Sequence, residues 1–219
     1  MHEALLQKAA EKNISIDSIP FIRVQQRTDD TTQTTIYSLA AENILAIFTS
    51  KNAVEVVAKI VKTIPAWQAA CIHGATANAA AAFLGEKQIV LTGNTGKELA
   101  AQLCKMPSSL PFVFFAGNKR LDVIPKALQY AGIAFEVITL YDTEATPSVL
   151  SKEYDGILFM SPSAADSFFS CNHISNDTVV FAIGETTAAA IRALSPAPVI
   201  VAKQHSQENL IQQLIDYYT

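Results

Sequence analysis

Residues 44–54 read Ile44-Leu-Ala-Ile-Phe-Thr-Ser-Lys-Asn-Ala-Val54, and 111 positions later residues 155–165 read Asp155-Gly-Ile-Leu-Phe-Met-Ser-Pro-Ser-Ala-Ala165. In each stretch an apolar run of buried-strand length leads into a serine that can cap a following helix. Extended without a gap, the alignment pairs residues 42–108 with 153–219 and gives 14 identities. About five identities are expected by chance at ordinary composition. We therefore interpret the chain as an internal duplication.

Each copy of the repeat predicts three strand–helix units. The expected strands are 44–49, 69–72 and 88–91 in the first copy, and 156–160, 179–183 and 199–202 in the second. Between the copies, 112–116 and 135–141 predict two more strands around a helix at 121–131, which Gly132 ends. Alternating strands and helices are typical of parallel sheets covered on both faces. The expected fold class is α/β, with two flavodoxin-like lobes whose parallel sheets are flanked by helices.

The segment between the copies has half of a counterpart at the start of the chain. At an offset of about 119, an expected helix at 5–12 matches the helix at 121–131. Asn13 then stands in place of Gly132, and residues 14–21 are expected to be extended. The partner of strand 112–116 would lie before residue 1, so we expect the first lobe to lack its first strand.

Two polar stretches without hydrophobic periodicity, 27–35 and 142–146, predict linkers. They divide the chain into a discontinuous first lobe, 1–26 plus 147–219, and a second, inserted lobe, 36–141. Because the chain would cross twice between the lobes, we expect a two-stranded hinge with a cleft between them. Such clefts commonly bind ligands.

Composition and charge exclude several classes of protein. The 219 residues carry 16 basic and 20 acidic side chains, a net charge of −4, whereas a general nucleic-acid binder has a basic excess. The N-terminus lacks the pattern of a signal peptide, and no apolar stretch approaches the roughly 18 residues of a membrane span. Cys71, Cys104 and Cys171 show no metal-ligand spacing. We expect a cytoplasmic protein with no membrane or nucleic-acid partner and no metal site.

The predicted strand-to-helix loops offer an anion site. Ligands of parallel sheets bind at the carboxyl ends of the strands, where helix N-termini favour negative charge. The loops rich in glycine and small hydroxyl residues are 49–52, 72–76, 116–120, 161–163 and 184–187. Helix capping explains any one of them, but for five equivalent loops a binding role is equally well supported.

Other candidate groups favour structural explanations. Residues 92–96, Thr-Gly-Asn-Thr-Gly, resemble a flavodoxin-type phosphate loop, but the repeat partner 203–207 lacks glycine, which favours an ordinary turn. His73 follows a predicted strand, and its repeat partner is Gly184, which favours a surface histidine. No set of residues forms a recognisable catalytic constellation.

Several segments, in this order and spacing, resemble the uroporphyrinogen-III synthase family. They are Ile47-Phe-Thr-Ser-Lys-Asn-Ala-Val54, Gly117-Asn-Lys-Arg-Leu-Asp-Val-Ile-Pro-Lys-Ala-Leu128, Leu140-Tyr-Asp-Thr143, Leu158-Phe-Met-Ser-Pro-Ser163, Ala182-Ile-Gly-Glu-Thr-Thr-Ala188 and Glu208-Asn-Leu210. The resemblance runs from about residue 5 to the C-terminus and agrees with the two-lobed repeat.

The resemblance implies an enzyme that cyclises hydroxymethylbilane to uroporphyrinogen III, losing water and inverting ring D through a spiro intermediate. It implies no metal or organic cofactor. Tyr141 matches the family tyrosine that helps the hydroxyl depart. The positions implied to bind the polycarboxylate substrate are Ser50, Asn52, Thr76, Gly117, Asn118, Lys119, Ser161, Ser163, Thr186 and Thr187. Lys51 and Arg120 could counter further carboxylates.

Two other functions remain open from the sequence. A non-catalytic, two-lobed binding or regulatory homologue would fit the missing strand, and a flavin carrier would use residues 92–96. For the synthase we expect a monomer, with the upstream hydroxymethylbilane synthase as a candidate partner.

Overall fold

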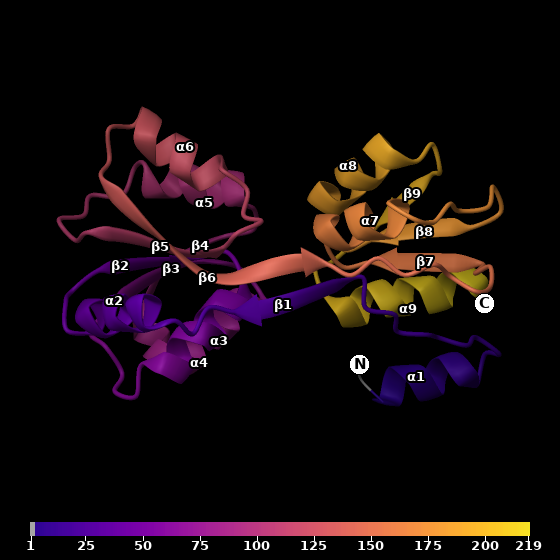
Figure 1. Cartoon of the computed structure of the whole chain (residues 1–219), viewed down its shortest axis with the longest axis horizontal. Helices are drawn as coiled ribbons and strands as arrows, with labels where there is room; N and C mark the ends of the chain where they lie inside the picture. Colours follow the sequence, from indigo (N-terminus) through magenta and orange to yellow (C-terminus); the bar gives the residue numbers. More distant parts are fainter. Residues whose placement is uncertain (1–2) are drawn as a thin grey trace. The chain divides into compact units, whose positions relative to one another are not determined.

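The computed structural model describes residues 3–219 and divides the chain into two compact units, here called unit 1 and unit 2 (Figure 1). Unit 1 comprises the chain up to Arg23 together with Glu144–Thr219, and unit 2 is Val24–Thr143. The chain passes between the units within strands β1 (Ile22–Gln26) and β6 (Phe135–Ala145), which are neighbours in one sheet. The fold is mixed α/β, as expected.

Unit 2 holds the larger sheet, ordered β1-β6-β5-β2-β3-β4. Its further strands are β2 (Leu45–Phe48), β3 (Gln68–Ile72), β4 (Ile89–Gly93) and β5 (Phe112–Gly117). Every neighbouring pair from β4 through β2 and β5 to β6 is parallel. Counted from β2 the order is 3-2-1-4-5, the doubly wound order in which the topology reverses between β2 and β5. The expected parallel sheet with flanking helices is confirmed for this unit, and its strand order goes beyond what the sequence predicted.

Helices cover both faces of this sheet (Figure 1). The helices of unit 2 are α2 (Asp30–Ala40), α3 (Lys51–Ile60), α4 (Ala75–Leu84), α5 (Gly96–Leu103) and α6 (Val123–Tyr130), with the 3-10 turn η1 (Glu86–Gln88) before β4. Because side chains alternate along a strand, Ala46 and Phe48 pack in the core under α2, α3 and α4. Leu45 and Ile47 pack in the core under α5 and α6. The buried Trp67 donates its indole N–H to the carbonyl of Leu39 at 2.9 Å and so ties α2 to the first core.

Unit 1 repeats this design with fewer strands. Within residues 3–219 its sheet consists of the parallel strands β7 (Gly156–Phe159), β8 (Val179–Ala182) and β9 (Val199–Val201). Its helices are α1 (Glu3–Ala10), α7 (Pro162–Phe169), α8 (Glu185–Leu194) and α9 (Gln207–Tyr218). One core lies between the sheet and α7 with α8, and the other between the sheet and α1 with α9.

The helix ends that align in the repeat adopt matching conformations. Asn13 and Gly132 follow α1 and α6 with φ of 59° and 69°, the left-handed conformation that ends many helices. Asparagine tolerates this conformation better than most residues, which explains how Asn13 stands in place of a glycine. Ser50 and Ser161 both cap their helices, as predicted.

Two predicted segments need correction. We expected a linker at 27–35, but α2 begins at Asp30, because Asp29 caps it by accepting from the amide of Thr32 at 2.9 Å. The buried residues of α2 lie in its last turns, beyond the expected linker, so no periodicity was visible there. The expected linker at 142–146 is strand as far as Ala145. Residues 14–21, expected to be extended, contain no helix and lead into β1.

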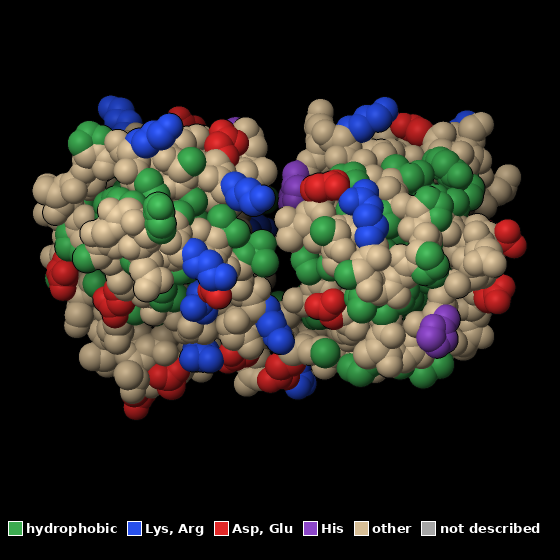
Figure 2. Space-filling model, turned by 90° about the horizontal axis from the view of Figure 1, so that it is seen from above, with side chains coloured by type: hydrophobic (Ala, Val, Ile, Leu, Met, Phe, Trp, Pro, Cys, Tyr) green, Lys and Arg blue, Asp and Glu red, His purple; other side chains and the backbone are tan. Residues whose placement is uncertain are grey.

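The surface carries charges of both signs. On the face shown in Figure 2, lysine and arginine side chains lie among acidic and apolar ones on both units. None of the helices within residues 3–219 has the length and apolar character needed to cross a membrane. An anionic ligand must therefore be held by local groups rather than by the net charge.

Cysteine is buried where it lies in a core strand. Cys71 is fully buried in β3, and burial raises the pKa of its thiol to about 12, which disfavours a thiolate ligand or nucleophile. Cys104 and Cys171 are half-buried.

Candidate functional site

The carboxyl ends of the parallel strands of unit 2 form one edge of the sheet, here called edge 2. Ser50 follows β2, His73 follows β3, and Asn118 and Lys119 follow β5. Edge 2 includes the point between β2 and β5 where the topology reverses. Ligands of doubly wound sheets bind at this point, so the sequence-predicted residues after β2 and β5 lie where a ligand is expected.

Tyr141 lies at edge 2, directly beside the end of β5. In the strand register Gly117 is the partner of Tyr141, and the Asn118 amide donates to the Tyr141 carbonyl at 3.0 Å. A Cβ on residue 117 would lie 2.6 Å from Cζ of Tyr141, closer than atoms can pack. Gly117 therefore makes room for the phenol ring, which is buried except for 9% of its surface.

The loop after β5 is fastened to β6. The side-chain carbonyl oxygen of Asn118 accepts from the Thr143 amide at 2.8 Å, so this side chain holds the segment that carries Tyr141. Lys119 is exposed and is free to approach an anion. Gly117 and Asn118 thus hold the segment that carries Tyr141. That they also bind substrate directly stays a prediction.

Arg120, in the same loop, contains a polar atom without a hydrogen-bond partner. Its Nε is buried and donates to no acceptor within residues 3–219, and the nearest carboxylate oxygen, Asp122 Oδ1, is 3.9 Å away. Leaving a buried donor unpaired is costly, and such groups often await a ligand. The sequence named Arg120 as a cation that could counter a carboxylate, but it could not show this unpaired donor.

The remaining predicted residues of edge 2 lie at helix starts. Ser50 Oγ accepts from the Asn52 amide at 3.2 Å, and both side chains are half-buried. Thr76 is buried in the first turn of α4. Lys51 forms an ion pair with Glu55 at 3.1 Å, so its charge is already partly balanced. Capping accounts for the position of Ser50 and leaves its hydroxyl hydrogen free to donate.

The carboxyl ends of β7, β8 and β9 form the corresponding edge of unit 1, here called edge 1. Ser161 caps α7 by accepting from the Ala164 amide at 3.1 Å, and Ser163 is half-buried in the first turn of that helix. Thr186 is exposed and Thr187 is buried, both in the first turn of α8. The cap residue of α8, Gly184, offers no side chain, so α8 begins with amide groups that no side chain caps. Such amides favour an anion.

A histidine also lies at edge 1. A Cβ on Gly184 would lie 2.6 Å from both Cδ2 and Nε2 of His205, so the exposed imidazole rests against the backbone of Gly184. The sequence analysis assigned no role to His205. One signal in the sequence could have identified His205: residue 184 is glycine, whereas the aligned residue of the first copy is His73.

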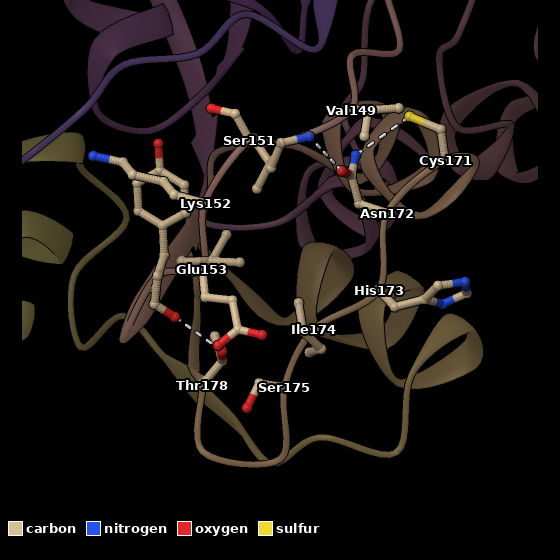
Figure 3. Close-up of a pocket in the computed structure, with 13 residues that line it drawn as sticks. Val149, Ser151, Lys152, Glu153, Cys171, Asn172, His173, Ile174, Ser175 and Thr178 are labelled. Carbon is tan, nitrogen blue, oxygen red and sulfur yellow. Dashed lines mark hydrogen bonds between the residues drawn. The ribbon is translucent and has the colours of Figure 1, made fainter.

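A pocket of about 340 Å³ lies at the opposite edge of unit 1, at the amino ends of β7 and β8 (Figure 3). None of the sequence-predicted site residues lines it. Asn172, in its wall, donates to the carbonyls of Ser148 and Phe168 and accepts from the Leu150 amide. This side chain is therefore occupied in fixing the loops, and the pocket is separate from the candidate site.

The glycine-containing loop at 92–96 is explained by helix capping. Thr95 accepts from the Glu98 amide at 3.1 Å, and Glu98 accepts in return from the Asn94 amide at 2.9 Å. A Cβ on Gly93 would lie 2.7 Å from the backbone nitrogen of Leu99, so this glycine allows α5 to approach β4. Gly93, Asn94 and Thr95 thus have structural roles that require no phosphate.

Comparisons with known proteins agree on one family. A family model described as "Uroporphyrinogen-III synthase HemD" matches residues 3–212. No curated protein sequence matches the chain. Among solved structures, a uroporphyrinogen-III synthetase from Helicobacter pylori 26695 is 19% identical, with a TM-score of 0.64 over 91% of this chain and 92% of that chain.

Two structures from the extremely thermophilic bacterium Thermus thermophilus are similar as well. A mutant uroporphyrinogen III synthase is 14% identical, with a TM-score of 0.68 over 99% of this chain and 94% of that chain. The wild-type protein is 17% identical, with a TM-score of 0.52 over 98% of this chain and 92% of that chain. At these identities the structures show a shared fold, and the family model shows the relationship.

Proposed function

The chain belongs to the uroporphyrinogen-III synthase family, and from its geometry we propose how its residues divide the work of that reaction. The enzyme is a cyclising lyase that converts hydroxymethylbilane to uroporphyrinogen III with loss of water and inversion of ring D. Loss of the hydroxyl gives an azafulvene, which ring D attacks to form a spiro intermediate that fragments and recloses. The protein must assist hydroxyl loss, hold the folded chain and exclude water.

Tyr141 assists the departure of the hydroxyl. The observation that carries this assignment is the contact of its ring with Gly117, which fixes a phenol at the carboxyl end of β5, one of the two strands at the topological switch point. The phenol O–H donates a hydrogen bond to the substrate hydroxyl as the C–O bond breaks. A donor whose ring is held by packing needs little reorganisation in the transition state.

The loops of both edges bind the side-chain carboxylates of the substrate. At edge 2 the binding groups are Ser50, Asn52, Thr76, Lys119 and the unpaired Nε of Arg120. At edge 1 they are Ser161, Ser163, Thr186, Thr187 and the first amides of α8. Hydroxyls and amides supply most of these donors, which fits a binding site in a chain with a net charge of −4.

This assignment gives the units different tasks. Unit 2 carries the phenol and so controls the bond-breaking step, whereas unit 1 contributes binding. We further propose that the enzyme acts as a cytoplasmic monomer in two lobes that receives hydroxymethylbilane from the synthase that makes it. Because free hydroxymethylbilane closes spontaneously, a short transfer would limit the loss. Sedimentation of the purified protein tests the monomer.

The isomer composition of the product tests the function. Purified protein is supplied with hydroxymethylbilane, the products are oxidised to porphyrins, and the type I and type III isomers are separated. We expect type III to dominate, whereas the reaction without enzyme gives the unflipped type I isomer. Product with the composition of the enzyme-free reaction would exclude the proposed activity.

A further inference from the structure

Each unit carries a histidine near the carboxyl end of its sheet, but at different positions of the aligned repeat. At the offset of 111 positions, His73 after β3 aligns with Gly184 after β8, and Asn94 before α5 aligns with His205 before α9. Each unit therefore has one histidine in this pair of adjacent loops, but on a different loop. The N-caps confirm the alignment, because Thr95 and Ser206 directly follow the exchanged positions.

The structure of unit 1 shows why residue 184 is glycine. Its φ is −173°, an extended conformation open to any residue, so the backbone does not require glycine. The ring of His205 lies 2.6 Å from the place of a Cβ, so a side chain at residue 184 would have to displace this ring. The imidazole of His205 thus takes the space that a side chain on residue 184 would need.

The loop lengths explain how His205 reaches this place. In unit 2 the N-cap Thr95 comes two residues after the end of β4, and Asn94 donates to Glu98 of its own helix at 3.1 Å. In unit 1 the N-cap Ser206 comes five residues after the end of β9. The longer loop lets His205 fold back over the end of β8, where unit 2 carries His73.

We propose that His73 and His205 are equivalent substrate-binding residues, each donating an imidazole hydrogen bond to a carboxylate of the tetrapyrrole at its own edge. This rests on the proposed function. Neither side chain is buried, and the six ion pairs within residues 3–219 use lysine or arginine as the cation. An accessible imidazole that no carboxylate of the protein engages, beside the amides of a helix start, is suited to a ligand carboxylate.

The test moves the histidine of unit 1 from position 205 to position 184, which is the position that aligns with His73 of unit 2. His205→Asn should raise KM for hydroxymethylbilane roughly 3- to 10-fold with kcat within twofold, because a binding contact is lost. Gly184→Ala should raise KM similarly by displacing the ring, and should add nothing in the His205→Asn background. The double variant Gly184→His with His205→Asn should return KM to within about twofold of wild type.

The matched control is His173→Asn, because His173 is also an exposed histidine of unit 1 but lines the pocket at the opposite edge (Figure 3). It should leave both constants unchanged. His73→Asn should reproduce the KM effect in unit 2. Binding of uroporphyrin III, followed by fluorescence, gives a second readout that needs no turnover and should weaken in parallel.

Each result decides for or against the proposal. If the wild type is active but the double variant is no better than His205→Asn, the equivalence of the two histidines is wrong. If His205→Asn lowers kcat and thermal stability without changing KM, the residue is structural. If the wild type neither produces the type III isomer nor binds uroporphyrin III, both the proposed function and this inference fail.

Discussion

Edge 1 and edge 2 are built from segments that align in the repeat, yet they differ in the side chain at the position of Tyr141. Both place a capping serine after the first strand of the copy and a buried threonine in the next helix start. Edge 2 in addition borders β5 and β6, which bring Tyr141 onto Gly117. At the offset of about 119 the position matching Tyr141 is Ile22, which has no hydroxyl. The repeat therefore has matching strand-to-helix loops in both units, and the phenol of Tyr141 has no counterpart at position 22.

The largest difference between the two units should appear when Tyr141 is substituted. Tyr141→Phe should lower kcat about 100-fold, the scale of one positioned proton donor, and leave KM nearly unchanged. The measurement is steady-state formation of the type III isomer. Ile22→Val, at the matching position of the other copy, is the control and should keep kcat within twofold. An unchanged kcat in Tyr141→Phe would remove the phenol from the mechanism.

Gly117 lies under the ring of Tyr141 and Gly184 lies under the ring of His205, so substitutions of the two glycines compare the two units. Gly117→Ala should lower kcat roughly tenfold and cost about 1–3 kcal/mol of stability, because the added methyl displaces the Tyr141 ring. Gly184→Ala should leave kcat within twofold, because the ring it displaces belongs to a binding residue. Gly96→Ala serves as a control, since no atom lies within 4 Å of the added methyl. Equal kcat losses at 117 and 184 would contradict the division of tasks.

Substitutions of Ser50 and Ser161 distinguish a role in helix capping from a role in substrate binding. Ser50→Ala and Ser161→Ala should each cost about 1 kcal/mol in the free energy of unfolding, measured by urea denaturation. Ser50→Asp and Ser161→Asp keep an oxygen acceptor for the cap and should retain most of that stability. Because they add negative charge beside the substrate carboxylates, they should raise KM about tenfold. Aspartate variants with unchanged KM would show that these serines only cap helices.

The smallest expected effect concerns acid stability. The Arg27 guanidinium, which donates to Asp142 at 2.9 Å, holds the pKa of that carboxyl below its usual value, and the Lys152 ammonium does the same to the pKa of Asp17. A lowered folded pKa means that the stabilisation is complete above the unfolded pKa of about 3.9 and is lost as the pH falls below it.

Asp142→Asn and Asp17→Asn should therefore weaken the loss of stability between about pH 4 and pH 2. Thermal denaturation over that range measures the change, with Asp177→Asn as an exposed control. The pairs lie at the surface, so the effect should be small and should shrink in high salt. An unaltered pH dependence in both variants would show that these ion pairs do not stabilise the fold.

Sequence reasoning recovered the repeated pattern because it depends on local features. Apolar runs marked the strands, and Ser50, Ser161, Asn13 and Gly132 marked helix ends at which one residue type is favoured by its own conformation or hydrogen bond. The loops after the strands followed from the fold class. These parts of the site needed no tertiary information.

What the sequence missed depends on contacts between distant residues. The start of α2 was hidden because its apolar face, with Ile36 and Leu39, is buried only by tertiary packing. The roles of Gly117 and Gly184 depend on rings that arrive from other strands and loops. The unpaired Nε of Arg120 likewise exists only once the loop is folded. Composition and spacing contain none of these distances.

The central claim is that unit 2 performs the bond-breaking step while unit 1 binds substrate. The most direct test compares single-turnover rates at saturating hydroxymethylbilane for Tyr141→Phe and for Ser163→Ala combined with Thr186→Ala. The account predicts a rate about 100-fold below wild type for the first and within about twofold for the second. Equal losses of rate in the two variants would contradict it.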